Sequence, residues 1–213
     1  MTSRHRYDLD HNQTKWAFSP IRSKYDYAEI LLSAVKVMLV PTSPNDGQKA
    51  SEMILHVAKM SRLFFSRPKK IYSVNFPFVA TSHPDGSLSF SSHAHPRIDH
   101  KATSIALGLL TEIKQPGMGA LDLAAYVDEA AQVDPYAWDL LLNLLTIEDG
   151  YVRYDDDVDN VNGDRHPQHH IDIFYSNHTT FKLGLTGERS QQDILDMLDI
   201  LTDCHFVSKR TRV

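Results

Sequence analysis

Cysteine is almost absent from this chain of 213 residues, because Cys204 is the only one. No internal disulfide can form, and a zinc site built from several cysteines is excluded. No stretch reaches the roughly 20 consecutive apolar residues that span a bilayer, and the N-terminal segment lacks the apolar run of a secretory signal. These absences predict a cytoplasmic protein with no membrane-embedded part.

A surplus of basic charge is missing as well. The formal net charge of −5 does not predict a general nucleic-acid-binding surface, although a local basic patch remains compatible with it. The chain also has no glycine-rich nucleotide-binding loop and no Gly-x-Ser-x-Gly motif. What it does contain is histidine: eight of its 12 histidines lie in the windows 83–100 and 166–178. This clustering is the main compositional pointer to a functional site.

The apolar periodicity predicts an α+β protein that is mainly helical. Helices are expected at about 24–40, 48–65, 101–114, 120–132 and 135–147, and from Ser190 to Leu201. Strand patterns predict a small antiparallel sheet built from hairpins at about 71–92 and 151–185, the first with an Asp85-Gly86 turn. Residues 1–18 are expected to be a polar N-terminal arm, either mobile or docked through Trp16 and Phe18. Residues 19–208 then form a single α+β domain, and 209–213 a basic tail.

The segment 151–185 holds the densest group of side chains able to perform chemistry. Five aspartates lie between Asp155 and Asp164, and His166, His169, His170, Asp172 and Lys182 follow. A hairpin with the three-residue loop 177–179 would pair Ile173 with Leu183 and Asp172 with Gly184, which keeps the apolar residues together. This register predicts that four polar side chains share one face: His170, Asp172, Thr180 and Lys182.

Such a face is typical of a metal-dependent phosphodiesterase, in which carboxylates hold the metal and a lysine stabilises charge on the phosphate. The expected catalytic residues are His170, Asp172 and Lys182. The expected ligands of a divalent metal such as Mg²⁺, Mn²⁺ or Zn²⁺ are Asp155, His166, His170 and Asp172. The layout is similar to that of restriction-type nucleases, but Thr180 stands where their Glu-x-Lys motif has an acid.

Two other interpretations stay open. His93 and His95 could converge with His166, His169, His170 and Asp172 to bind Zn²⁺ or Mn²⁺. Alternatively, residues 155–164 form a solvated loop, and Asp172 pairs with Arg165 or another basic group. The protein would then be a non-catalytic accessory module that binds a protein partner or a nucleic acid.

The motif Arg165-His166-Pro167, then His170-Ile171-Asp172-Ile173-Phe174-Tyr175-Ser176, then Phe181 to Leu185, resembles a bacterial family known only as a domain of unknown function. Arg153-Tyr154-Asp155 and Gly163 belong to the same resemblance, which covers most of the chain. The family has no established activity, cofactor or substrate. The resemblance implies a bacterial cytosolic protein of a kind that often accompanies mobile or defence genes, with a protein partner encoded nearby.

Overall fold

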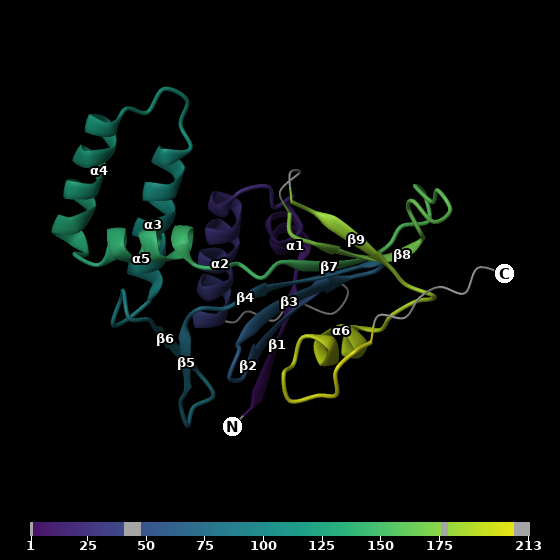
Figure 1. Cartoon of the computed structure of the whole chain (residues 1–213). Helices are drawn as coiled ribbons and strands as arrows, with labels where there is room; N and C mark the ends of the chain where they lie inside the picture. The colour runs from purple at the N-terminus through teal and green to yellow at the C-terminus, as the bar shows by residue number, and fades with distance from the viewer. Residues whose placement is uncertain (1, 41–47, 176–178, 207–213) are drawn as a thin grey trace.

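The largest element of the structure is a seven-stranded antiparallel sheet. The computed structural model describes residues 2–40, 48–175 and 179–206, and in this part the strand order is β1-β2-β3-β4-β7-β8-β9 (Figure 1). The strands of the sheet are β1 (Ser3–Leu9), β2 (Ser51–Val57), β3 (Arg62–Arg67), β4 (Lys70–Asn75), β7 (Val152–Asp156), β8 (His169–Ile173) and β9 (Phe181–Gly184). A separate hairpin consists of β5 (Val79–Ser82) and β6 (Leu88–Ser91).

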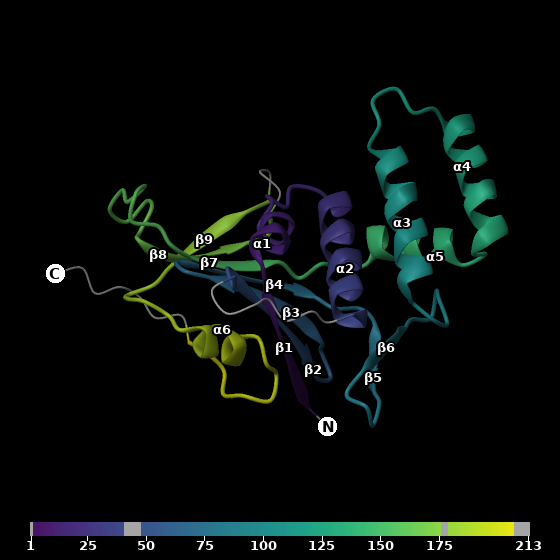
Figure 2. The same cartoon turned by 180° about the vertical axis from the view of Figure 1, so that it is seen from behind.

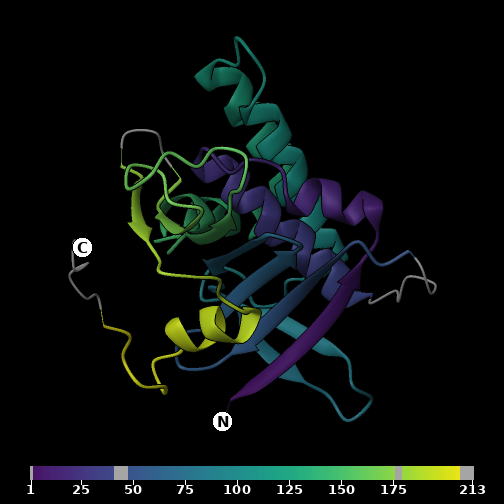
Figure 3. The same cartoon turned by 90° about the vertical axis from the view of Figure 1, so that its right-hand side faces the viewer.

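Helices cover both faces of this sheet. The helices are α1 (His11–Ala17), α2 (Lys24–Leu39), α3 (His100–Ile113), α4 (Ala120–Val133), α5 (Ala137–Thr146) and α6 (Gln191–Met197). On one face, Met53, Leu55 and Phe65 join the main core with the buried stripe of α2. On the other, Ile54 and Phe64 form a smaller core with α6. Figure 3 shows α6 (yellow) on one side of the sheet and α1 and α2 (purple) on the other.

Helices α3, α4 and α5 form a helical lobe (residues 100–146) beside α2, at the opposite end of the molecule from β8 and β9 (Figures 1 and 2). Lys114, just after α3, makes ion pairs with Asp26 at 3.2 Å and with Glu29 at 2.7 Å, both on α2. Helix α4 is the outer member and contains no buried residue. The lobe is therefore attached through α3 and α5, while α4 faces solvent.

The expectation of a mainly helical protein with a small sheet is wrong, because 35 % of the described residues are helical and 26 % are in strands or bridges, most of them in one seven-stranded sheet. The error comes from residues 48–65, which form β2 and β3 rather than a helix. Both strands lie inside the sheet and are covered on both faces, so Met53, Ile54 and Leu55 are all buried. A strand buried on two sides reads as a continuous apolar run and hides the alternation that marks an exposed strand.

The segment 71–92 does not form one hairpin. Its first part is β4, which pairs with β3 and β7 in the main sheet. The expected Asp85-Gly86 turn does form: it joins β5 to β6, and Gly86 has a positive φ of 84°.

The expected N-terminal arm contains the edge strand β1 and helix α1. Trp16 and Phe18 pack against the main core, as expected for a docked arm. The expected basic tail at 209–213 lies outside the described residues.

The β8–β9 hairpin forms with a register two residues away from the expected one. Ile173 pairs with Phe181, and Asp172 lies directly opposite Lys182. A shift of two residues preserves the face on which each side chain lies. The expectation that His170, Asp172 and Lys182 share one face is therefore confirmed, whereas Thr180 lies before the start of β9. The expected loop at 177–179 lies largely outside the described residues.

Candidate functional site

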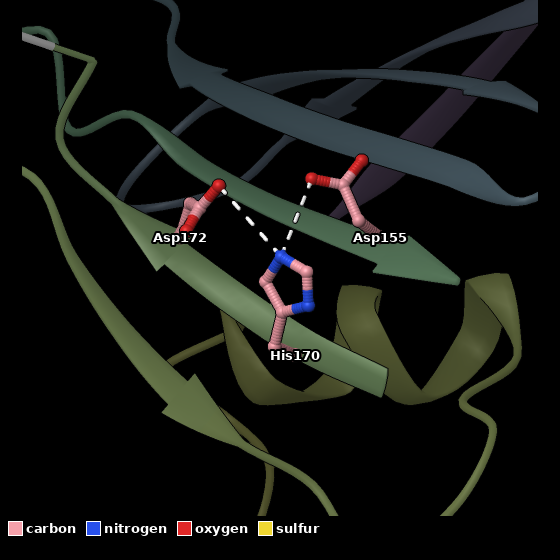
Figure 4. A group of neighbouring side chains, drawn as sticks. All are labelled: Asp155, His170 and Asp172. Atoms are coloured by element: carbon pink, nitrogen blue, oxygen red, sulfur yellow. Dashed lines mark ion pairs between the residues drawn. The ribbon is translucent and has the colours of Figure 1, made fainter. Parts of the chain in front are cut away.

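Three donor side chains meet where β7 and β8 lie side by side. Asp155 on β7 is opposite His170 on β8, and Asp172 follows His170 by two residues, so all three point to the same face. His170 Nε2 lies 3.8 Å from Asp155 Oδ2 and 3.9 Å from Asp172 Oδ2 (Figure 4). All three residues are buried, and one ligand atom of each lies within 4.8 Å of the others. The sheet thus holds a buried His/Asp cluster that could bind a metal ion.

The hydrogen bonds of His170 assign its protonation. Lys182 Nζ on β9 lies 3.0 Å from His170 Nε2. An ammonium group only donates, so Nε2 accepts this bond and the ring proton sits on Nδ1. Nδ1 lies 2.9 Å from the carbonyl oxygen of Pro167, to which it donates. This arrangement directs the Nε2 lone pair of His170 into the cluster, which is the orientation a metal-binding imidazole needs.

Three cations surround the two carboxylates. Arg153 on β7 donates from Nε to Asp155 Oδ2 at 2.6 Å and from Nη2 to Asp172 Oδ2, so it bridges both acids. Lys182 Nζ lies 2.8 Å from Asp172 Oδ1, and Lys70 Nζ on β4 lies 3.4 Å from Asp155 Oδ1. The basic side chains are 30–37 % exposed, whereas the acids are less than 10 % exposed. The cluster therefore presents an excess of positive charge on its solvent side.

Burial and neighbouring groups act on the pKa values beside the cluster. Burial alone would lower the pKa of Arg153, but Tyr151 and Asp155 outweigh it and raise that pKa above its ordinary value. Arg153 therefore remains a cation throughout the physiological pH range. Burial raises the pKa of Tyr151, whose hydroxyl accepts a hydrogen bond from Arg153 Nη1 at 3.3 Å. Tyr151 is accordingly neutral next to the charged groups.

The donor geometry fits a divalent ion after a small contraction. Metal–ligand bonds of about 2.1 Å in a tetrahedral site separate neighbouring donors by roughly 3.4 Å. The distances of 3.8 and 3.9 Å around His170 Nε2 would have to shorten by a few tenths of an ångström. One imidazole and two carboxylates are donors that suit Zn²⁺ or Mn²⁺. The side-chain chemistry thus suits such an ion, and the two distances at His170 are close to the required spacing, while the two carboxylates lie within 4.8 Å of each other.

A metal ion would have to replace contacts that the donor atoms make in this structure. Asp172 Oδ1 is buried and has no hydrogen bond within the described structure; Lys182 is at ion-pair distance but not in hydrogen-bond geometry. A buried acceptor in this state is incompletely satisfied by the protein. A metal ion would require Arg153 to leave both Oδ2 atoms and Lys182 to leave His170. Both side chains are long and partly exposed, so they can turn to solvent.

His166 lies beside the cluster but belongs to the β7–β8 loop. Its ring centre is 4.7 Å from that of His170. Its Nδ1 is 2.6 Å from the carbonyl oxygen of Asn160, and its Nε2 is 3.6 Å from Asp157 Oδ2. The contacts of both ring nitrogens are therefore with residues outside the donor set. Of the four expected ligands, the structure brings together Asp155, His170 and Asp172.

The alternative site, made of histidines from both windows, does not form. His95 Nε2 is 2.9 Å from Asp134 Oδ2, and His93 lies beside an asparagine of α5, so both are at the helical lobe. His169 points to the other face of the sheet, where its Nδ1 is 3.0 Å from the hydroxyl of Tyr154. The two histidine windows thus belong to different parts of the molecule.

The Asp-rich loop packs over the end of β9 through Pro167. A Cβ at Gly184 would lie 2.8 Å from Pro167 Cγ, so the loop approaches this closely only over a glycine. This contact holds Pro167 where its carbonyl oxygen accepts the hydrogen bond from His170. Residues 158–165 are exposed, as expected for a solvated loop, but Asp155 is buried on β7.

Sequence reasoning gave no role to two residues of the cluster, Arg153 and Lys70. Of the partners expected for Asp172, Arg165 or another basic group, the structure shows another basic group, Arg153. Arg153 lies two residues before Asp155 on one strand, so the same alternation argument applied to 151–156 would have placed it on this face. Lys70 could not have been found in this way, because its approach depends on the pairing of β4 with β7.

Comparison of the chain with protein-family models, with curated proteins and with solved structures finds no match to any of them. The resemblance to a bacterial family of unknown function therefore stays a prediction. Within the described residues, no helix combines the length and the apolar character needed to cross a membrane.

Proposed function

We propose that the cluster of Asp155, His170 and Asp172 binds a divalent metal ion and that the protein hydrolyses phosphodiesters there. The observation that carries this proposal is the convergence of three buried donors from β7 and β8, with Lys182 in contact with two of them. The second carboxylate comes from the neighbouring strand as Asp155. Asp155 therefore takes the place of the acid that restriction-type nucleases have in their Glu-x-Lys motif, where this chain has Thr180.

Each side chain has a separate role in this proposal. Asp155, His170 and Asp172 would hold the ion, which when bound would polarise a phosphoryl oxygen. Lys182 and Arg153, released to the solvent side, would stabilise negative charge on the phosphate. Lys70, 33 % exposed at the rim, would attract the anionic substrate.

A second candidate function is nucleic-acid binding without cleavage. It is favoured by the present ion pairs, in which the two carboxylates are already matched by three cations. Phosphates would then bind to the excess positive charge, with affinity that falls as salt concentration rises. The two candidates differ in the effect of a metal ion: in the first it causes cleavage of the nucleic acid, and in the second it alters only the affinity of binding.

The test is an assay of phosphodiester hydrolysis with bis(p-nitrophenyl) phosphate and with single- and double-stranded DNA and RNA. Each is incubated with Mg²⁺, Mn²⁺ or Zn²⁺ and the wild-type protein, Asp172→Asn or Lys182→Met. We expect metal-dependent cleavage that Asp172→Asn abolishes. Lys182→Met should slow it by about 100-fold or more, the usual effect of removing one group that stabilises transition-state charge, while metal binding is retained.

Asp159→Asn, an exposed loop variant with the same change of charge as Asp172→Asn, is the matched control and should cleave like the wild type. Circular dichroism of every variant checks that the fold is intact. Cleavage that survives Asp172→Asn would identify a contaminating nuclease. Salt-sensitive binding to DNA or RNA without cleavage under any metal would replace the catalytic proposal with the second candidate.

A further inference from the structure

The helical lobe is acidic beyond the end of α3. Between residues 115 and 148 there is no lysine, arginine or histidine, while six acidic residues occur: Asp122, Asp128, Glu129, Asp134, Asp139 and Glu148. This segment alone holds more negative charge than the whole chain's net charge of −5. Lys114, immediately before it, is occupied by Asp26 and Glu29 of α2. Asp134 is paired with His95, but none of the other five acids makes an ion pair among the described residues.

Helix α4 adds an exposed apolar surface to this charge. Leu121 is 88 % exposed, Val133 52 % and Tyr126 41 %. Tyr126 and Val133 alternate with acids at helical spacing, because Asp122, Tyr126, Glu129 and Val133 are separated by four, three and four residues. Residues at this spacing lie on one face of a helix. Helix α4 thus presents one stripe that is both apolar and acidic.

This stripe borders a groove of about 600 Å³ between the end of α3 and α4. Glu112 of α3 and Glu129 of α4 both line the groove, together with the apolar side chains of Met118, Ala125 and Tyr126. Neither Glu112 nor Glu129 has an ion-pair partner among the described residues. The groove therefore offers apolar contact between two unneutralised carboxylates.

We propose that this groove docks a basic, amphipathic helical segment of a partner protein. An apolar stripe of the segment would cover Met118, Ala125 and Tyr126, and its lysines or arginines would reach Glu112 and Glu129. Helix-in-groove recognition uses such a combination of apolar anchors and complementary charge. The chemistry disfavours other occupants, because nucleic acids and anionic membranes are repelled by the acids, and a second copy of the lobe carries the same charge. The proposal is independent of the metal centre at β7 and β8.

The test measures binding of a fluorescently labelled synthetic helical peptide of about four turns, by anisotropy, to the full-length protein. The peptide has leucines at helical spacing on one face and lysines on the other. A control peptide keeps the leucines and replaces lysine with glutamate. The protein variants are Glu112→Lys/Glu129→Lys and Glu112→Lys/Asp128→Lys. Both pairs change the net charge equally, but Asp128 lies outside the groove lining.

We expect saturable binding of the lysine peptide, weaker at high salt, and little binding of the glutamate peptide. The double variant Glu112→Lys/Glu129→Lys should weaken binding by at least about tenfold. The double variant Glu112→Lys/Asp128→Lys should have a clearly smaller effect. Equal losses in the two pairs would show non-specific attraction, and absence of saturable binding would show no docking groove; either result overturns the proposal. Analytical ultracentrifugation of the same variants detects self-association. A monomer–dimer equilibrium that depends on Glu129 would overturn the proposal, because the groove would then bind a second copy of this chain. Equal melting temperatures exclude unfolding as the cause.

Discussion

Acidic side chains occupy two contrasting settings in this molecule. On β7 and β8, Asp155 and Asp172 are buried and are contacted by Arg153, Lys182 and Lys70. On α4, Asp128 and Glu129 are exposed and make no ion pair among the described residues. Burying a carboxylate costs several kcal/mol unless it is paired, so the sheet can hold its acids only with the cations alongside. The lobe avoids that cost by exposure, which leaves its charge available to a partner.

The largest effect on stability is expected at the sheet cluster. Asp172→Ala would leave Arg153 and Lys182 without their shared acid and should lower the free energy of unfolding by roughly 3 kcal/mol. This value is at the low end of the stability loss expected when one partner of a buried ion pair is removed, because both cations are partly exposed and can turn to water. Urea denaturation measures the change. Asp128→Ala on α4 is the comparison and should stay within about 0.5 kcal/mol of the wild type. Equal effects would remove the contrast between the two settings.

A smaller effect is expected where the β7–β8 loop closes on β9. Gly184→Ala would place a Cβ 2.8 Å from Pro167 Cγ and should destabilise the protein by about 1–2 kcal/mol, as overpacking does. The displaced Pro167 would also loosen the hydrogen bond that orients His170. Gly187→Ala is a matched control, since nothing lies within 4 Å of a Cβ there. A loss of stability in Gly187→Ala as large as in Gly184→Ala would mean that the Pro167 contact is not responsible.

Asp134 sharpens the comparison, because it is a buried acid of the otherwise exposed acidic segment. Burial alone would raise its pKa, but the hydrogen bonds from His95 and from the Tyr136 backbone N–H outweigh burial and lower the pKa below 3.8. An acid with a lowered folded-state pKa stabilises the protein above its unfolded-state pKa, and this stability is lost as pH falls through the folded-state pKa. The wild type should therefore lose more stability than Asp134→Asn between about pH 5 and pH 2, by less than about 1 kcal/mol. Urea midpoints across this pH range report the difference, and parallel curves would contradict it.

The smallest effect is expected at the groove. Glu129→Gln removes one of several like charges and should leave the free energy of unfolding unchanged within about 0.5 kcal/mol, or raise it slightly. Thermal unfolding at low ionic strength, where repulsion is least screened, measures it. A loss above about 1 kcal/mol would show that Glu129 has a structural partner, and the lobe would then resemble the sheet cluster.

Helices α2 to α6 and the shared face of the hairpin were accessible from sequence because their patterns are local, whereas α1 was not expected and the helix expected at 48–65 is two strands. Helix α2 spans Lys24–Leu39 where periodicity predicts 24–40, and Ser190 caps α6 as expected. Side-chain alternation placed His170, Asp172 and Lys182 on one face even though the register was wrong by two residues. A period of two is insensitive to such an error.

Long-range pairing was not accessible. The sheet is assembled from β1, β2, β3, β4 and the later strands β7, β8 and β9, and the helical lobe is inserted between β4 and β7 in the chain. Nothing local in Met53–Leu55 reveals that α2 and α6 cover its two faces. Lys70 likewise reaches Asp155 only because β4 pairs with β7. The three donors and Lys182 were therefore predictable from local alternation, which also applies to Arg153, while the approach of Lys70 was not.

The most direct test of the metal centre is isothermal titration of the protein with Zn²⁺ and Mn²⁺, together with Mn²⁺ electron paramagnetic resonance. The wild type should bind one ion per chain, and Asp155→Asn should weaken binding by at least about tenfold, because it removes a ligand. Asp156→Asn is the matched control, since the next residue on β7 points to the opposite face. Stoichiometric binding that Asp155→Asn weakens and Asp156→Asn leaves intact would support the centre. Absence of binding, or equal losses in the two variants, would contradict it.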